Sequence, residues 1–73
     1  MKAYWDILRE LREDHDLTQA QVAAVIGTTQ QVYYRYEKGI NALPLHHLQT
    51  LCAYYNASAD YILGLPKGLR WPR

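Results

Sequence analysis

The side chains best suited to chemistry in this sequence are the amides and cations that lie between residues 19 and 38. Gln30 and Gln31 are adjacent, and Arg35 follows Gln31 by about one turn of a helix. Glutamine amides both donate and accept hydrogen bonds, and the guanidinium group of arginine donates several in a planar fork. Such groups are suited to binding a polar partner through hydrogen bonds, and they are less typical of a catalytic site.

No set of residues is arranged for catalysis or metal binding. His46 and His47 are adjacent, so on a helix their side chains diverge by about 100° and cannot chelate one metal ion together. His15 has no ligand-like partner, and the run Asp14-His15-Asp16 is typical of a helix end. The sequence contains no Ser-His-Asp arrangement and no glycine-rich phosphate loop. We therefore expect no enzymatic activity and no cofactor.

The single cysteine, Cys52, excludes an internal disulfide and a cysteine-rich zinc site. It lies at helical spacing from Leu48, Leu51 and Tyr55, which predicts a buried core residue in preference to a reactive thiol. A lone thiol also fits a reducing cytoplasm.

The composition is that of one small globular domain. The chain has 73 residues, of which 49% are hydrophobic, and its net charge of +1 is not that of a strongly basic nucleic-acid binder. Five of the seven acids lie in the first sixteen residues, whereas residues 30–73 carry five basic residues and two acids. A local positive face is compatible with this distribution. The sequence lacks a secretory signal and an apolar run of about 20 residues, so we expect a cytoplasmic protein.

Apolar periodicity predicts five helices and no strand. The first helix ends near His15 and has one apolar face, with its charged residues, Arg12 among them, on the other; the apolar face is formed by Tyr4, Ile7, Leu8 and Leu11. Trp5 lies off this face, where it can cover a helix edge or contact another subunit.

The next two helices are short. Thr18 and Gln21 have the spacing of a capping box, and Gly27 ends the second helix. Thr28-Thr29 supplies the next N-cap, and Gly39 ends a third helix over residues 29–38. Its apolar residues, Tyr33 and Tyr36, are expected in the core.

The fourth helix is predicted to begin with Pro44 at its first helical position and to end at Asn56 in a left-handed conformation. Its apolar stripe is Leu45, Leu48, Leu51, Cys52 and Tyr55. Ser58 caps a fifth helix over residues 59–63, which Gly64 ends. Residues 1–65 then form one domain, and residues 66–73 form an extended basic tail.

Residues 19–39 have the organisation of a helix-turn-helix, which requires two short helices and a tight turn with glycine. Ala23 is small where the helices would cross, and Gly27 can adopt the positive φ that the turn needs. Any compact pair of helices shows some of these features. Spacing alone therefore leaves DNA binding open.

Three segments carry a more specific pattern: TQAQVAAVIG at 18–27, TTQQVYYRYEKG at 28–39 and YYNASADYILG at 54–64. Together with Leu43-Pro44 they resemble the Cro/CI (XRE) family of helix-turn-helix regulators over about residues 4–65. The run Thr28 to Gln31 is similar to the start of the recognition helix of a lambdoid phage repressor. The resemblance implies an all-α, five-helix, lambda-repressor-like DNA-binding domain.

The resemblance also implies which side chains meet DNA. Gln30, Gln31 and Arg35 match positions that reach base edges, where glutamine suits adenine and arginine suits guanine. Tyr34 lies on the same side and can touch a phosphate or a thymine methyl group. The phosphate-contacting positions are Gln19, Thr29, Lys38, Asn41 and the amides around Gly39.

These assignments have plainer alternatives. Glutamines at a helix start are commonly only solvated, and Arg35 can pair with a surface acid. Glu37 is expected to be structural, because a carboxylate near phosphates would repel them. Val32 can contact a thymine methyl group or add to the core. The loop after the third helix, which is basic in many relatives, is apolar here and weakens the expected phosphate grip; it contains Ile40, Ala42 and Leu43.

The sequence thus predicts a transcriptional regulator, in the first place a repressor, that binds a pseudo-palindromic site in double-stranded DNA. We expect a homodimer, whether stable or formed only on DNA, and neither a membrane nor a small-molecule ligand as partner. The expected self-contact is made by Ile62, Leu63, Leu65, Leu69 and Trp71, although the tail can equally lie back on its own domain. The rival interpretation is a protein-interaction module such as the antitoxin partner of a toxin.

Overall fold

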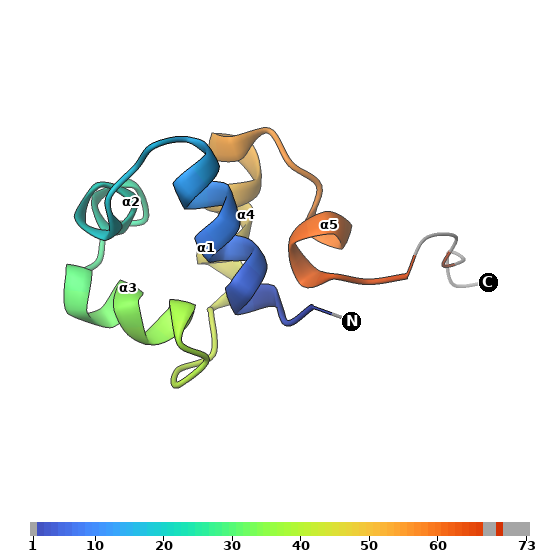
Figure 1. The fold of residues 1–73 in the computed structure, drawn as a ribbon, viewed down its shortest axis with the longest axis horizontal. Helices are drawn as coiled ribbons and strands as arrows, with labels where there is room; N and C mark the ends of the chain where they lie inside the picture. Colours follow the sequence, from blue (N-terminus) through green and yellow to red (C-terminus); the bar gives the residue numbers. More distant parts are fainter. Residues whose placement is uncertain (1, 67–68, 70–73) are drawn as a thin grey trace.

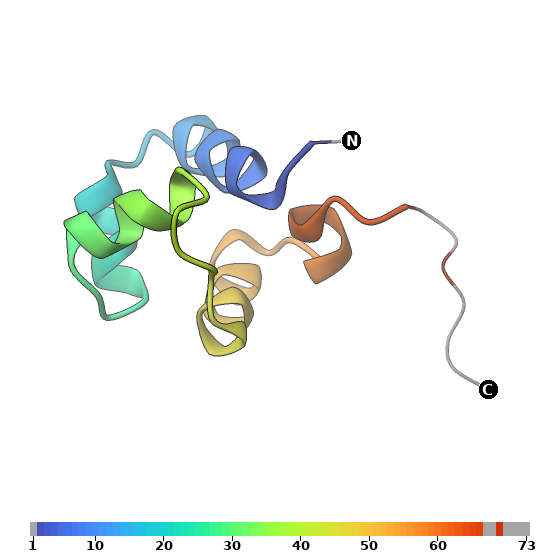
Figure 2. The ribbon, with the colours of Figure 1, turned by 90° about the horizontal axis from the view of Figure 1, so that it is seen from below.

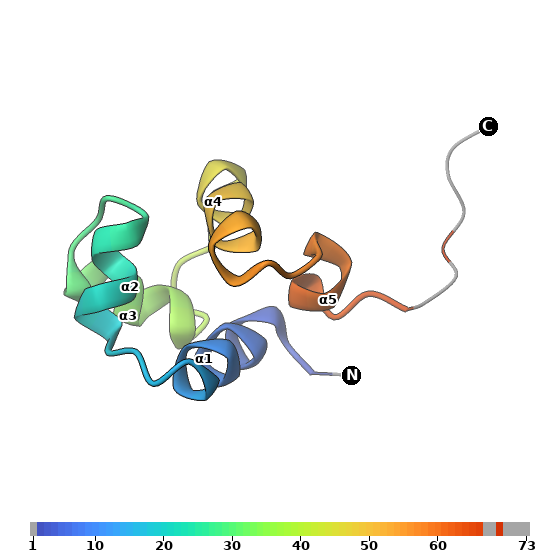
Figure 3. The same ribbon diagram turned by 90° about the horizontal axis from the view of Figure 1, so that it is seen from above.

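The computed structural model describes residues 2–66 and residue 69. Within this part of the chain the fold is all-α, as predicted, with helices α1 (Tyr4–Asp14), α2 (Gln19–Val25), α3 (Gln30–Glu37), α4 (Leu45–Tyr55) and α5 (Ala59–Leu63). Figure 1 shows α2 and α3 at one end of the elongated molecule and α5 at the other, with α1 and α4 between them. The views from below and above (Figures 2 and 3) place α1 and α4 on opposite sides of the long axis.

Each helix contributes one large, fully buried side chain to the core. These side chains are Leu8, Val22, Tyr33, Leu51 and Ile62. Complete burial of one such apolar side chain stabilises the fold by about 1.5–3 kcal/mol relative to leaving it exposed. All five helices therefore share a single core, and the predicted burial of Tyr33 is confirmed, as is that of Tyr36.

Hydroxyl groups begin three of the helices. Thr18 Oγ1 accepts the amide of Gln21, whose side chain accepts the amide of Thr18 in return, so the predicted capping box is present. Thr29 Oγ1 accepts the amide of Val32, and Ser58 Oγ accepts the amide of Tyr61. Each such cap satisfies an amide that the helix cannot satisfy itself, and is worth about 1 kcal/mol.

The same hydrogen-bond pattern ends every helix in the described residues. After α1 the amide of Asp16 donates to the carbonyl of Glu13, and the amide of Leu17 donates to the carbonyl of Arg12. The same pair of hydrogen bonds follows each of the other four helices. The closure needs a residue in the left-handed region, which is glycine after α2, α3 and α5. Asp16 and Asn56 take this conformation after α1 and α4, with φ of 54° and 52°. Short polar side chains tolerate it better than most others.

Two predictions about α4 are wrong in detail. Pro44 is the N-cap rather than the first helical residue, because its ψ of 148° is extended while its carbonyl already accepts the amide of Leu48. Leu45 does not join the core and is 76% exposed, because the stripe reaches the other helices only from Leu48 onward. Cys52 is half-buried and packs on the core from its edge.

Trp5 covers the end of α3, which is one of the two roles left open for it. A Cβ atom placed on Gly39 would lie 2.8 Å from Cε2 of the Trp5 ring, so the indole lies directly against this glycine. The neighbouring Tyr4 packs edge-on against Trp5, with ring centroids 5.1 Å apart, and its hydroxyl accepts the amide of Leu43 at 3.1 Å. The first turn of α1 therefore holds the loop that follows α3.

This contact predicts different effects of alanine at two glycines with nearly equal φ, 74° at Gly27 and 72° at Gly39. No atom lies within 4 Å of a Cβ at Gly27, so Gly27→Ala should cost only the left-handed strain of about 1–2 kcal/mol. Gly39→Ala should cost about 1–3 kcal/mol more because of the collision with Trp5. Urea unfolding measures both costs. Equal losses, or a difference that persists in a Trp5→Ala background, would contradict the contact.

Candidate nucleic-acid interface

The outward face of α3 carries the four side chains that the sequence assigns to base recognition. Gln30, Gln31, Tyr34 and Arg35 are all exposed, whereas Tyr33, Tyr36 and Glu37 on the inward face are buried. The helix is therefore anchored by one side and open on the other. Such a face can insert into a groove without any change in the fold.

Lys38 lies beside this face and contacts Tyr34. Its Nζ atom is 5.6 Å from the centroid of the Tyr34 ring, which is a cation–π arrangement. The pair keeps a positive charge beside Tyr34 on the exposed face of α3. Thr29 is also exposed, and its hydroxyl oxygen already serves as the helix cap.

The loop after α3 corrects one expectation. The amides of Gly39, Ile40 and Asn41 all bond back to carbonyl groups of α3, those of Tyr36 and Arg35. These three amides close the helix and are not free to bind a phosphate. Asn41 is half-buried, and Ile40 is 66% exposed.

Gln19, assigned to a phosphate contact, is half-buried at the start of α2. Its Nε2 atom donates to Oε1 of Glu37, the last residue of α3, at 3.2 Å. The amide therefore has a fixed partner within the protein before any ligand is present. This bond joins the first residue of α2 to the last residue of α3.

Glu37 is structural, as expected, and forms a buried ion pair with Arg12 of α1. Arg12 Nε lies 2.7 Å from Glu37 Oε2, and Arg12 Nη2 lies 3.2 Å from Glu37 Oε1. The third nitrogen, Nη1, donates to the carbonyl of Leu17 at 3.0 Å. One guanidinium group thus joins α1, the loop before α2, and α3.

The placement of Arg12 on the polar face of α1 was wrong, since its side chain is only 14% exposed. A signal was present in α3, where Glu37 follows Tyr33 by four residues and so lies on the buried stripe. A carboxylate at such a position needs a cation. The sequence does not say which of the arginines supplies it.

The ion pair determines the protonation of the groups around it. Burial by itself would raise the pKa of Glu37, but the hydrogen bonds from Arg12 and Gln19 outweigh it and hold that pKa below its usual range. Burial raises the pKa of Tyr55 to about 12, with a further contribution from the negative charge of Glu37. The pKa of Tyr33 is raised for the same two reasons. Both phenols therefore remain neutral at physiological pH.

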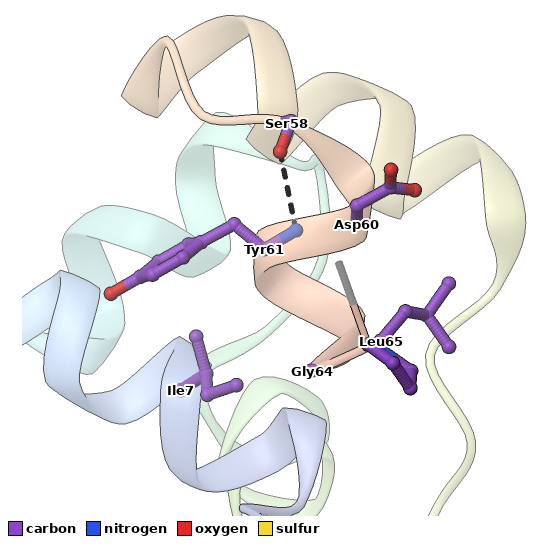
Figure 4. Close-up of a pocket in the computed structure, with 7 residues that line it drawn as sticks. Ile7, Ser58, Asp60, Tyr61, Gly64 and Leu65 are labelled. Atoms are coloured by element: carbon purple, nitrogen blue, oxygen red, sulfur yellow. Dashed lines mark hydrogen bonds between the residues drawn. The ribbon is translucent and has the colours of Figure 1, made fainter. Parts of the chain in front are cut away.

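Two hollows lie away from this interface. One, of about 500 Å³, lies between α1 and α5, and in Figure 4 Ile7 and Tyr61 approach it from the two helices. Among the described residues that line it, Asp60 supplies the one carboxylate, and the Ser58 hydroxyl is used as a cap. The other is an apolar groove between α4 and α5 of about 670 Å³, with Leu45, Cys52 and Leu63 in its lining.

Comparison with family models decides the family. The model described as helix-turn-helix matches residues 8–62, a range that contains α2, α3 and their turn. The chain belongs to the helix-turn-helix family. This result confirms the resemblance to the Cro/CI (XRE) regulators. Among the described residues, no helix is long and apolar enough to cross a membrane.

Two curated relatives of this helix-turn-helix chain are longer proteins. The uncharacterized HTH-type transcriptional regulator YobD of Bacillus subtilis (strain 168) is 44% identical over 62 residues, which are 85% of this chain and 55% of YobD. The antitoxin PezA of Streptococcus pneumoniae serotype 4 is 32% identical over 62 residues, 85% of this chain and 39% of PezA. The chain thus spans about half the length of YobD and less of PezA.

A solved structure confirms the fold of the helix-turn-helix domain. The crystal structure of a transcriptional regulator from Listeria innocua superposes with a TM-score of 0.83 at 21% identity, and covers 92% of this chain and 63% of that one.

The lowered pKa of Glu37 predicts an acid-sensitive part of the stability. The unfolded carboxyl titrates near 4.5, and the folded one titrates lower. The ion pair therefore stabilises the fold fully above pH 4.5, and this contribution is lost as the pH falls through the folded pKa. Glu37→Gln leaves Arg12 without its counter-ion and should cost about 3 kcal/mol at neutral pH.

Urea unfolding of the wild type and of Glu37→Gln near neutral pH and below pH 4.5 measures this contribution. The difference in unfolding free energy should shrink in acid. Glu13→Gln, which neutralises an exposed carboxylate on α1, serves as the control and should cost little at either pH. A difference for Glu37→Gln that does not change with pH would contradict the assignment.

Proposed function

We propose that this chain binds double-stranded DNA sequence-specifically and regulates transcription, in the first place as a repressor. The observation that carries the proposal is the outward face of α3, which presents Gln30, Gln31, Tyr34 and Arg35 to solvent while its other face is buried. The second helix of a helix-turn-helix lies in the major groove in complexes of this class. The name of the relative YobD agrees with this function.

Base recognition in this proposal follows from hydrogen-bond chemistry. The amides of Gln30 and Gln31 suit the N6 and N7 atoms of adenine, and the guanidinium group of Arg35 suits O6 and N7 of guanine. The ring of Tyr34 contacts a thymine methyl group or a phosphate. Phosphate contacts come from Gln19, Thr29, Lys38 and Asn41, which flank this face along the chain.

Two copies would read two half-sites of a pseudo-palindromic operator, about 34 Å apart, as one turn of DNA requires. The self-contact expected at the C-terminal end needs one correction, because Ile62 is fully buried and belongs to the core. Leu63, Leu65 and Leu69 are exposed and remain candidates. The predicted contribution of Trp71, and most of the extended tail, lie outside the described residues.

A second candidate function is that of a protein-interaction module. The similarity to the antitoxin PezA favours it, as does the apolar groove between α4 and α5, where Leu45 is 76% exposed. An antitoxin can also bind DNA, so the two functions overlap. A toxin-like reading frame beside the gene would favour the second candidate.

Selection from random oligonucleotides with the purified protein, followed by titration of the enriched duplex at controlled salt, tests the first proposal. Gln30→Ala should weaken binding to the selected site by about 1–3 kcal/mol and relax the preference at one base pair. Lys38→Ala should instead weaken binding to all duplexes similarly and lower the salt dependence by about one counter-ion. Selection that enriches no motif, or two variants with the same profile across sequences, would refute the assignment.

Sedimentation tests the assembly. A dimer on a full palindromic duplex is expected, and Leu63→Ser with Leu65→Ser should reduce pairing without changing affinity for a half-site. A wild-type protein that is monomeric both free and on the palindrome would exclude the dimer.

A further inference from the structure

Glu37 is shared between a cation and an amide that come from two other helices. Its Oε1 atom accepts from Arg12 Nη2 and from Gln19 Nε2, each at 3.2 Å, while its Oε2 atom accepts from Arg12 Nε at 2.7 Å. Glu37 is only 4% exposed. Because the arginine holds both carboxylate oxygens, the carboxylate cannot turn away from Gln19 without breaking the ion pair.

This sharing fixes the orientation of the Gln19 amide. An ionised carboxylate only accepts hydrogen bonds, so the nitrogen of the amide, and not its oxygen, must face Glu37. One N–H of Gln19 is thereby used. The second N–H remains for an acceptor outside the protein.

We propose that Glu37 is a positioning residue for DNA binding, which holds the amide of Gln19 ready to donate its second N–H to a backbone phosphate. The inference rests on the proposed function. A side chain already held in its bound orientation loses less conformational entropy on binding, so the contact is stronger than one made by a free glutamine. Because Glu37 is also the last residue of α3, the same bond sets the distance between this phosphate donor and the face of Gln30 and Arg35.

Removing the charge of Glu37 separates its positioning role from its electrostatic effect on DNA binding. Glu37→Gln removes a negative charge near the interface, which by electrostatics alone would strengthen binding to DNA. It also replaces one of the two acceptor oxygens by an NH₂ group. In one orientation this group opposes Nε of Arg12, and in the other it opposes Nη2 of Arg12 and Nε2 of Gln19, so the three donors can no longer all be satisfied. Weaker binding by this variant therefore goes against the change in charge and reports the lost positioning.

The experiment is a double-mutant cycle on the selected duplex with the full chain, at a temperature where circular dichroism shows every variant folded. Gln19→Ala should weaken binding by about tenfold, and Glu37→Gln in the wild-type background by about threefold to tenfold. In the Gln19→Ala background, Glu37→Gln should change the affinity by less than about twofold. The control Glu13→Gln, which removes an exposed charge from α1, should leave affinity equal or higher.

A loss from Glu37→Gln that is equal in both backgrounds would overturn the positioning role and leave DNA binding intact. A wild-type protein that binds no duplex specifically would overturn both this inference and the function on which it rests.

Should Glu37→Gln fail to fold, NMR of the wild-type protein tests whether Glu37 holds the Gln19 amide. The two side-chain amide protons of Gln19 should be widely separated and move when Glu37 titrates, unlike those of exposed Gln30 and Gln31. Signals that coincide with those of Gln30 and Gln31 would overturn the proposal.

Discussion

The ion pair between Arg12 and Glu37 is the interaction on which the arrangement of α1, α2 and α3 depends. A buried pair of this kind contributes little net stability compared with an apolar pair of the same shape, but it is costly to break from one side. Its effect is therefore geometric. Through the bond of Arg12 to the carbonyl of Leu17 and the bond to Glu37, it holds the start of α2 and the end of α3 against α1.

The outward face of α3 is exposed to solvent because the inward face packs against the rest of the protein and holds the helix in place. Tyr33 and Tyr36 fill the core, and Trp5 closes over Gly39 at the end of the helix. The amides of Gly39, Ile40 and Asn41 are used in ending α3. In the proposed complex, contacts from Ile40 and Asn41 would therefore come from their side chains rather than from their amides.

Local chemistry made the five helices predictable. Hydroxyl caps such as Thr18 and Thr29, and glycine at the helix ends, act within one turn of where they stand in the sequence. The predictions that are wrong concern residues whose surroundings depend on other helices. Helical spacing predicts Arg12 on the polar face of α1, because its partner is 25 residues away and nothing near Arg12 in the sequence reveals it. The exposure of Leu45 depends on how far the core extends along α4. The candidate face of α3 followed from helical spacing, whereas the bond between Gln19 and Glu37 required the packed fold.

The central claim is that the exposed side chains of α3 meet base-pair edges while the ion pair beneath them stays intact. The structure of the protein on its selected duplex tests it most directly. We expect α3 in the major groove, with Gln30, Gln31 and Arg35 on base edges and Arg12 still bonded to Glu37. A complex in which α3 faces away from the DNA, or in which Glu37 has left Arg12, would contradict it.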